Sequence, residues 1–177
     1  MSRHLSLIGM PGAGKTTLGQ ALAVHFGLPF VDLDAEIVTR AGQLIPAIFA
    51  QQGEAYFRQL EADTLRAVLA RPAPLVLAAG GGTPCFHDGI AVLNQHSITL
   101  WLDVPVPTLL ARLQATETAR RPLLSQAPEG LETRLRETLT ARTQFYRQAR
   151  LRCADEACTV AALLPLLAGA GFPSPAV

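Results

Sequence analysis

Lysine is the scarcest basic residue of this chain, because its 15 basic residues comprise 14 arginines and the single lysine Lys15. The acidic residues number 14, so the formal net charge is only +1. Such a balance gives no general attraction to nucleic acid or to an anionic membrane surface. A single lysine also argues against a guanine-specific GTPase, whose base-reading N/T-K-x-D element needs a second one. Any phosphate chemistry must therefore come from a local site.

Cysteine and long apolar runs are scarce as well. The cysteines Cys85, Cys153 and Cys158 are odd in number and have no CxxC spacing. We therefore expect neither a disulfide framework nor a zinc site, and we expect the reducing cytoplasm as the location. The longest apolar stretch, from 160 to 172, is shorter than the ~20 residues of a membrane-spanning helix and contains Pro165. The N-terminal apolar run is too short for a secretory signal. Because neither apolar stretch is long enough to cross a membrane, we also expect no membrane partner.

The order of apolar segments is typical of an α/β protein. A hydrophobic content of 49% over 177 residues suits one domain with a sizeable core, which we expect over 1–170. β-like runs lie at 4–9, 29–34, 74–80, 97–103 and 149–155, and helical patterns lie at 16–26, 35–41, 45–51, 54–71, 89–95, 107–114, 131–148 and 160–167. This alternation predicts βαβ units with a parallel sheet inside an α/β sandwich. The tail at 171–177, rich in proline and small residues, is expected to be disordered.

The stretch SLIGMPGAGKTTLGQ, from 6 to 20, matches the phosphate-binding pattern G-x-x-x-x-G-K-[ST]. It follows an apolar strand and precedes an amphipathic helix, so its backbone N–H groups should point at phosphate oxygens. The Lys15 ammonium fits between β- and γ-phosphates, where a planar guanidinium is too wide, and the Thr16 hydroxyl can bind Mg²⁺. A glycine-rich turn with a surface lysine is the alternative interpretation.

Two aspartates follow at the end of the second predicted strand, in FVDLDAEI. A strand period of two places Asp32 and Asp34 on the same side, and ligands of open α/β sheets lie beyond the carboxyl ends of strands. One carboxylate could hold Mg²⁺ through water, and the other could accept a proton from a substrate hydroxyl. As an alternative, Asp34 could be a helix N-cap.

Arginines on apolar helix faces indicate an anionic substrate. Glu61 lies near the middle of one apolar stripe with Arg58 at its edge, where Glu61 could orient Arg58 or simply form an ion pair with it. The apolar face of the last long helix includes Tyr146, and Arg142 is centred on it. Arg142 should bind an anion there unless it extends to solvent at the helix end. The glycines at 80–82 allow close approach of a ligand, or form a tight turn.

Together these segments resemble shikimate kinases over nearly the whole chain. The matching pieces are LIGMPGAGKTTLGQALA, DLD, IFAQQGEAYFRQLE, GGG, RPLL and RTQFYR. The resemblance implies a P-loop three-layer sandwich with a five-stranded parallel sheet flanked by helices. It also implies transfer of the γ-phosphate of ATP to the 3-hydroxyl of shikimate in aromatic amino acid biosynthesis. The acceptor would bind at about 33–61. The stretch 115–130 loses the helical period, and a loop that long is usually functional, so it would be the lid.

The resemblance also assigns roles to residues of this chain. It implies catalytic roles for Lys15, Asp34 and Arg121, with Arg120 as the alternative lid arginine. ATP would contact Gly12, Ala13, Gly14, Lys15, Thr16, Thr17, Arg112 and Arg121; shikimate would contact Asp34, Arg58, Glu61, Gly80, Gly81, Gly82 and Arg142; and Thr16 and Asp32 would attend Mg²⁺. We expect a monomer that binds shikimate and ATP but no nucleic acid. A gluconate-type or nucleotide kinase, or a nucleotide-dependent regulatory module, is the alternative.

Overall fold

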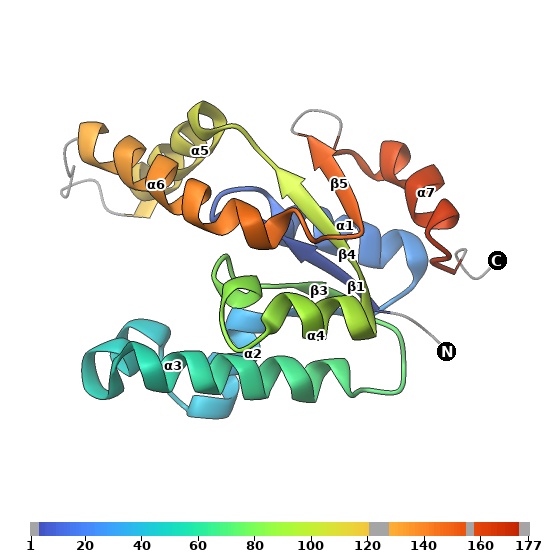
Figure 1. Ribbon diagram of the computed structural model, residues 1–177, viewed down its shortest axis with the longest axis horizontal. Coiled ribbons are helices and arrows are strands. Elements are labelled where there is room, and N and C mark those ends of the chain that lie inside the picture. Colours follow the sequence, from blue (N-terminus) through green and yellow to red (C-terminus); the bar gives the residue numbers. More distant parts are fainter. Residues whose placement is uncertain (1–3, 121–127, 155–157, 174–177) are drawn as a thin grey trace.

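The structure is a computed structural model that describes residues 4–120, 128–154 and 158–173. Within them lies one sheet of five parallel strands in the order β2-β3-β1-β4-β5 (Figure 1). The strands are β1 (His4–Ile8), β2 (Phe30–Asp32), β3 (Val76–Ala78), β4 (Ser97–Asp103) and β5 (Leu151–Ala154). Each lies inside a run that the sequence predicts as a strand, so the expected five-stranded parallel sheet is confirmed.

Helices cover both faces of this sheet. They are α1 (Lys15–Phe26), α2 (Leu33–Ala41), α3 (Ile45–Leu69), α4 (Gly89–His96), α5 (Val106–Arg120), α6 (Pro128–Tyr146) and α7 (Val160–Gly169), with a short 3-10 helix η1 (Thr83–Cys85). Helix α1 packs behind β1, β2 and β3 and contacts α7, while α4 packs in front on β4 and contacts α3 (Figure 1). Every residue of β1 is buried, as parallel strands covered on both faces must be. The three-layer sandwich is therefore confirmed.

The carboxyl ends of the central strands define where a ligand can bind. In Figure 1, β1 and β4 point to the left, where α2 and α3 lie below and α5 and α6 lie above. Each of these pairs is in contact. Loops that leave the strands therefore lie between two separate helical pairs, which is the usual position of a site in an open α/β sheet.

The helices differ from the predicted ones around the expected lid at 115–130. Helix α5 continues to Arg120 and α6 begins at Pro128, so the expectation of irregular structure at 115–120 and 128–130 is wrong. Alanine, glutamate and arginine favour a helix even where no apolar stripe faces a core, and proline is tolerated at a first helical position. Arg121 lies outside the described residues.

The expected disordered tail is ordered where it begins. Phe172 is buried, and its ring packs edge-on against Phe26 with 5.0 Å between the ring centroids. The backbone N–H of Phe172 donates a hydrogen bond to the carbonyl of Leu167. Burial of one aromatic side chain therefore attaches the start of this segment to α1, although proline and small residues surround it in the sequence.

The cysteines also differ from expectation. Cys153 and Cys158 form a disulfide with 5.5 Å between their Cα atoms, and Cys85 is free. An odd number of cysteines leaves room for one such pair, and a CxxC spacing is not required for it. The expectation of no disulfide is therefore wrong for this pair, and the cysteines no longer argue for a reducing compartment. No helix among the described residues is long and apolar enough to cross a membrane.

Candidate functional site

The loop between β1 and α1 forms an anion-binding helix start. Gly14 is the N-cap of α1 with a positive φ of 93°, and no side chain accepts from the N–H groups of the first turn. Gly12 also has a positive φ, of 81°. These conformations favour glycine and leave backbone donors at the positive end of the helix dipole, which is the arrangement that binds phosphate groups.

Lys15 lies folded against this loop. Its Nζ donates hydrogen bonds to the carbonyls of Gly9 and Met10, each at 2.9 Å. Burial lowers the pKa of Lys15 to about 8, while the nearby carboxylates of Asp34 and Asp32 act in the opposite direction. The ammonium group is therefore held beside both the phosphate-binding loop and the predicted acidic pair.

Thr16 and Asp32 meet at the start of α1 and α2. The Thr16 hydroxyl donates to Oδ2 of Asp32 at 3.1 Å. Oδ1 of Asp32 accepts from the backbone N–H groups of Asp34 and Ala35, so the N-cap of α2 is Asp32 and not Asp34. A hydroxyl and a carboxylate are oxygen ligands that suit Mg²⁺. No group of three or more His, Cys, Asp or Glu side chains among the described residues could hold a metal ion.

Asp34 lies on a helix and not on a strand. Strand β2 ends at Asp32, so the predicted period-two relation between the two aspartates is wrong. Asp34 stands in the first turn of α2 and is accessible to solvent, but its carboxyl faces protein on one side, since its Oδ1 would be 3.3 Å from a Cβ built on Gly80. Partial burial of the carboxyl, then the charges of Asp32 and Glu61, raise the pKa of Asp34. A carboxylate with a raised pKa is a better proton acceptor.

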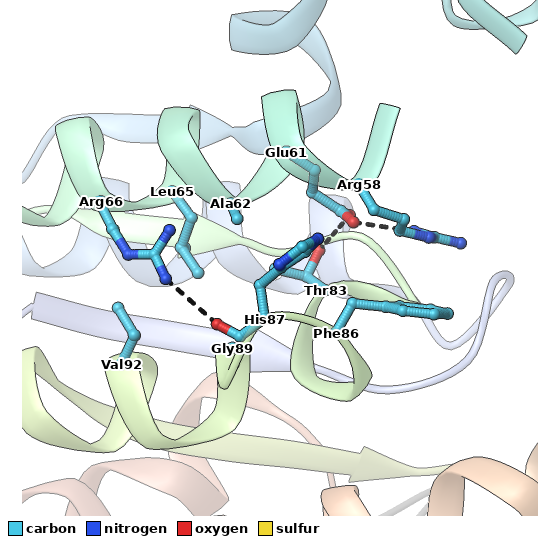
Figure 2. A pocket seen from close by; sticks show the side chains of 10 residues that line it. All are labelled: Arg58, Glu61, Ala62, Leu65, Arg66, Thr83, Phe86, His87, Gly89 and Val92. Carbon is cyan, nitrogen blue, oxygen red and sulfur yellow. Dashed lines mark hydrogen bonds and ion pairs between the residues drawn. The ribbon is translucent and has the colours of Figure 1, made fainter. Parts of the chain in front are cut away.

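Arg58 is held by two carboxylates on its own helix. Its Nη1 donates to Oε2 of Glu61 at 2.8 Å, and its Nε and Nη2 donate to Oε1 of Glu54 at 3.2 Å. Figure 2 shows Glu61 between Arg58 and Thr83, whose hydroxyl donates to Oε1 of Glu61 at 2.6 Å. The guanidinium also lies over the ring of Phe86, 4.2 Å from its centroid. The ion pair that the sequence suggests is present, and further contacts orient it.

The sequence did not point to Glu54, Thr83 or Phe86. Glu54 precedes Arg58 by four residues, a spacing that could have predicted the ion pair. Thr83 and Phe86 follow the glycine run and carried no comparable signal. Only the fold brings this segment to α3.

The glycine run at 80–82 is crowded by charged side chains. None of the three glycines has a positive φ, so a turn that requires glycine's backbone freedom does not explain them. A Cβ on Gly81 would lie 2.9 Å from Nη1 of Arg142, and one on Gly82 would lie 2.8 Å from Nη1 of Arg58. The run therefore lets both predicted arginines approach one stretch of backbone.

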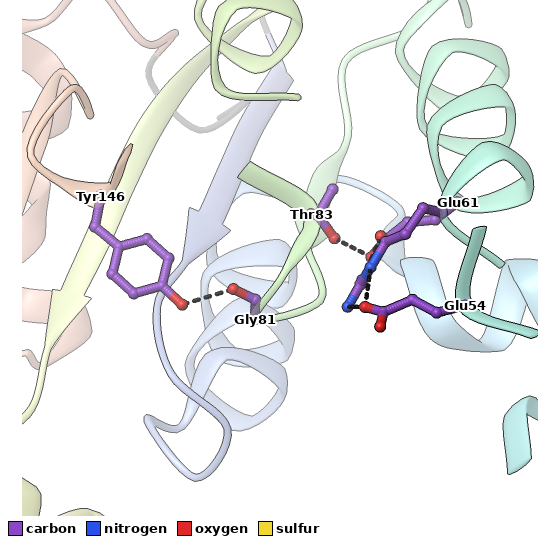
Figure 3. Close-up of polar contacts among 6 residues, drawn as sticks. Glu54, Glu61, Gly81, Thr83 and Tyr146 are labelled. Atoms are coloured by element: carbon purple, nitrogen blue, oxygen red, sulfur yellow. Dashed lines mark hydrogen bonds and ion pairs between the residues drawn. The ribbon is translucent and has the colours of Figure 1, made fainter. Parts of the chain in front are cut away.

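Tyr146 joins this backbone to α6. Its side chain is fully buried, and its hydroxyl donates to the carbonyl of Gly81 at 2.6 Å (Figure 3). The same hydroxyl lies 3.8 Å from the sulfur of Met10, at the start of the phosphate-binding loop. Burial raises the pKa of Tyr146 to about 12, so the hydroxyl remains a donor. The sequence pattern predicts only that Tyr146 lies on an apolar helix face.

A cavity of about 410 Å³ opens beside the phosphate-binding loop. Arg112 of α5 borders it and donates to the carbonyls of Gly12 and Ala13 at 3.4 and 3.3 Å. The cavity is lined by predicted nucleotide contacts (Ala13, Gly14, Thr17 and Arg112), by apolar side chains (Leu18, Ala21, Leu102 and Val104) and by Cys158. Its position and its largely apolar wall suit a nucleotide base and ribose.

Comparison with known sequences identifies relatives of this arrangement. A family model described as shikimate kinase matches residues 11–164. A shikimate kinase of Bacteroides fragilis is 39% identical over 154 residues, which cover 86% of either chain. One of Nostoc sp. (strain PCC 7120) is 46% identical over 150 residues, which cover 84% of this chain and 79% of the relative.

Solved structures agree in fold. The shikimate kinase of Bacteroides thetaiotaomicron superposes with a TM-score of 0.84 at 32% identity, covering 96% of this chain and 98% of the other. The enzyme of Acinetobacter baumannii, solved in complex with shikimate, gives a TM-score of 0.80 at 34% identity, covering 97% and 94%. With a family model that matches most of its length, this chain belongs to the shikimate kinase family.

Proposed function

We infer that this chain is an ATP-dependent kinase that transfers the γ-phosphate of ATP to the 3-hydroxyl of shikimate and releases ADP. The observation that carries this inference is the pair of arginines, Arg58 and Arg142, that approach the glycine run next to the phosphate-binding loop. Nucleotide binding alone does not require two guanidinium groups at this place. A carboxylate on the acceptor accounts for them, and the family supplies an acceptor that carries one.

The phosphate side of the reaction depends on the loop and Lys15. Backbone N–H groups at the start of α1 would bind the phosphate oxygens, and the Lys15 ammonium would neutralise charge between the β- and γ-phosphates. Thr16 and Asp32 would hold Mg²⁺, which neutralises charge that develops on the phosphates. Phosphoryl transfer needs little covalent help, so these groups act mainly by position and charge.

Asp34 would act on the attacking hydroxyl. From the first turn of α2 its carboxylate lies close to Gly80, where the acceptor is expected to bind. As the oxygen–phosphorus bond forms, the hydroxyl proton would pass to Asp34, and ADP would leave with the electrons of the broken bond. The raised pKa of Asp34 suits this role.

Other parts of the proposal rest on the family pattern. Arg121, with Arg120 as the alternative, would contact the transferring phosphate from a lid at about 115–130. A lid that closes over ATP would exclude water and keep hydrolysis without acceptor slow. We propose a cytoplasmic monomer that binds neither nucleic acid nor membrane.

An assay of ADP release with different acceptors tests the proposed function. Purified protein is given Mg²⁺, ATP and one of three acceptors: shikimate, gluconate or a nucleoside monophosphate. We expect rapid turnover with shikimate only, and phosphorus NMR of the product should place the phosphate on the 3-hydroxyl. Turnover with another acceptor and none with shikimate would contradict the proposal.

Arg142→Lys should raise the KM for shikimate by at least about tenfold, equivalent to ~1.4 kcal/mol, with ATP affinity nearly unchanged. Lysine keeps the charge but loses the paired hydrogen bonds that a guanidinium gives to a carboxylate. Steady-state kinetics with shikimate and with its methyl ester measure the effect. The ester should be a much poorer substrate for the original enzyme and only slightly poorer for the variant. An equal loss in both proteins would show that Arg142 recognises another group.

Tyr146→Phe should raise the KM for shikimate by about tenfold, because loss of the hydroxyl leaves the Gly81 carbonyl unpaired beside Arg142. Ser97→Ala is a matched control: the Ser97 hydroxyl is also buried and also donates to a backbone carbonyl at 2.6 Å, that of Leu93. Both variants should lose about 1 kcal/mol of stability in urea unfolding. A similar change of KM in both variants would argue for a general loss of stability instead.

A further inference from the structure

The disulfide Cys153–Cys158 connects the core to the nucleotide cavity. Cys153 lies on β5, buried and in register with Leu102 of β4. Cys158, only partly buried, follows the strand and contributes to the wall of the cavity of about 410 Å³. Gly14 and Arg112 line the same cavity, so one half of the disulfide faces the proposed nucleotide site and the other half is anchored in the sheet.

We propose that Cys153 and Cys158 form a thiol–disulfide modification site that controls the affinity of this cavity for the nucleotide. The disulfide form binds ATP more tightly than the dithiol form, while binding of the acceptor is the same in both. This inference rests on the proposed function only in taking the nucleotide to be ATP.

The direction follows from preorganisation. In the disulfide form Cys158 is tied to a buried strand residue, so its part of the wall is in place before the nucleotide arrives. In the dithiol form, nucleotide binding must also order the part of the wall that Cys158 forms, and this cost lowers the affinity for ATP. The effect is limited, because the next residue, Thr159, is independently held as the N-cap of α7 by accepting from the N–H of Ala162 at 3.2 Å. A change of several-fold, rather than loss of binding, is therefore expected.

The affinity for the acceptor should not depend on whether Cys153 and Cys158 form the disulfide. The free cysteine Cys85 lies on the acceptor side, on η1, where the hydroxyl of Thr83 donates to Glu61. Arg58 and Glu61 come from α3, and neither borders the nucleotide cavity. A change at Cys158 should thus be measured as a change in nucleotide affinity alone.

The chemistry is ordinary thiol–disulfide exchange with a low-molecular-weight disulfide. One cysteine thiolate attacks the small disulfide and releases one small thiol, and the second cysteine then displaces the other small thiol. Two protein thiols are oxidised to one disulfide, and the two electrons and two protons leave in the two small thiols. A small dithiol reverses the reaction.

Calorimetric titration of ATP into oxidised and reduced protein tests the proposal without any acceptor present. Oxidised protein is prepared with oxidised glutathione and reduced protein with dithiothreitol, and thiol titration under denaturing conditions should find one thiol in the first and three in the second. We expect the Kd for ATP to rise about threefold to tenfold on reduction. A separate steady-state assay should give the same KM for shikimate in both forms. Because the titration needs no turnover, failure of the proposed function would not affect it.

Two variants complete the test. Cys158→Ser should bind ATP equally under both treatments, with the affinity of the reduced protein. Cys85→Ser should keep the full difference between the oxidised and reduced forms. Equal affinity of the two forms of the original protein, failure of the disulfide to form, or a difference that persists in Cys158→Ser would overturn the proposal.

Discussion

Exchanging Lys15 for arginine should lower kcat by about 10²-fold or more, even though the charge is kept. The Lys15 ammonium fits within hydrogen-bond distance of the Gly9 and Met10 carbonyls, inside a tightly packed loop. A Cβ on Gly9 would lie 2.7 Å from the carbonyl oxygen of Leu102, so the backbone at Gly9 has no room to move towards Leu102. The loop therefore cannot make space for an arginine side chain at position 15. A planar guanidinium would therefore displace the phosphates from their place between the loop and the metal ligands.

Steady-state kinetics and thermal unfolding of the Lys15→Arg variant measure this effect. The unfolding temperature should change little, because Lys15 is the first residue of α1 and its side chain folds against the phosphate-binding loop, outside the apolar core. Arg40→Lys is the matched control, since it makes the reverse exchange on the exposed surface of α2 and should leave kcat unchanged. Turnover close to normal in Lys15→Arg would show that a charge at this position suffices and that its shape is irrelevant.

Replacing Asp34 with asparagine should also lower kcat by about 10²-fold or more, with ATP affinity nearly unchanged. The amide has almost the same shape but cannot accept the proton of the attacking hydroxyl. Stability should be retained, because the side chain that caps α2 is that of Asp32. This separates a role in catalysis from a role in folding.

Single-turnover kinetics, calorimetric titration of ATP and urea unfolding distinguish the two roles. Asp63→Asn serves as control, since it makes the same exchange on α3, where Asp63 accepts from Gln59 and pairs with Arg66. The control should keep its kcat. A loss of stability in Asp34→Asn with kcat intact would instead assign Asp34 a structural role.

The elements that could be predicted from the sequence are those whose physical cause is local. The phosphate-binding loop needs only the order of strand, glycines, lysine and helix, all within 6–20. The break at Gly53 between two helical patterns is present as a residue with φ of 80° inside α3. Each strand was visible as a short apolar run, because strands covered on both faces are apolar throughout.

Other features depend on residues far apart in the chain. The hydroxyl of Thr83 reaches Glu61 across 22 positions, and that of Tyr146 reaches Gly81 across 65. No periodicity of either segment encodes such a contact, so the sequence predicts only an apolar helix residue at Tyr146. Composition likewise predicts a disordered tail at Phe172, although burial against Phe26 decides its position.

The sequence by itself determined the fold class, the phosphate-binding loop and the kind of charges at the site, because these follow from local pattern and residue chemistry. Tertiary structure decided which of those charges meet. Asp34 lies at the start of a helix and not at the end of a strand. Arg58 and Arg142 approach one glycine run, and Cys153 is bonded to Cys158 beside the nucleotide cavity. These outcomes depend on where strands end and on how helices pack across the sheet, and both are set by burial of side chains from the whole chain.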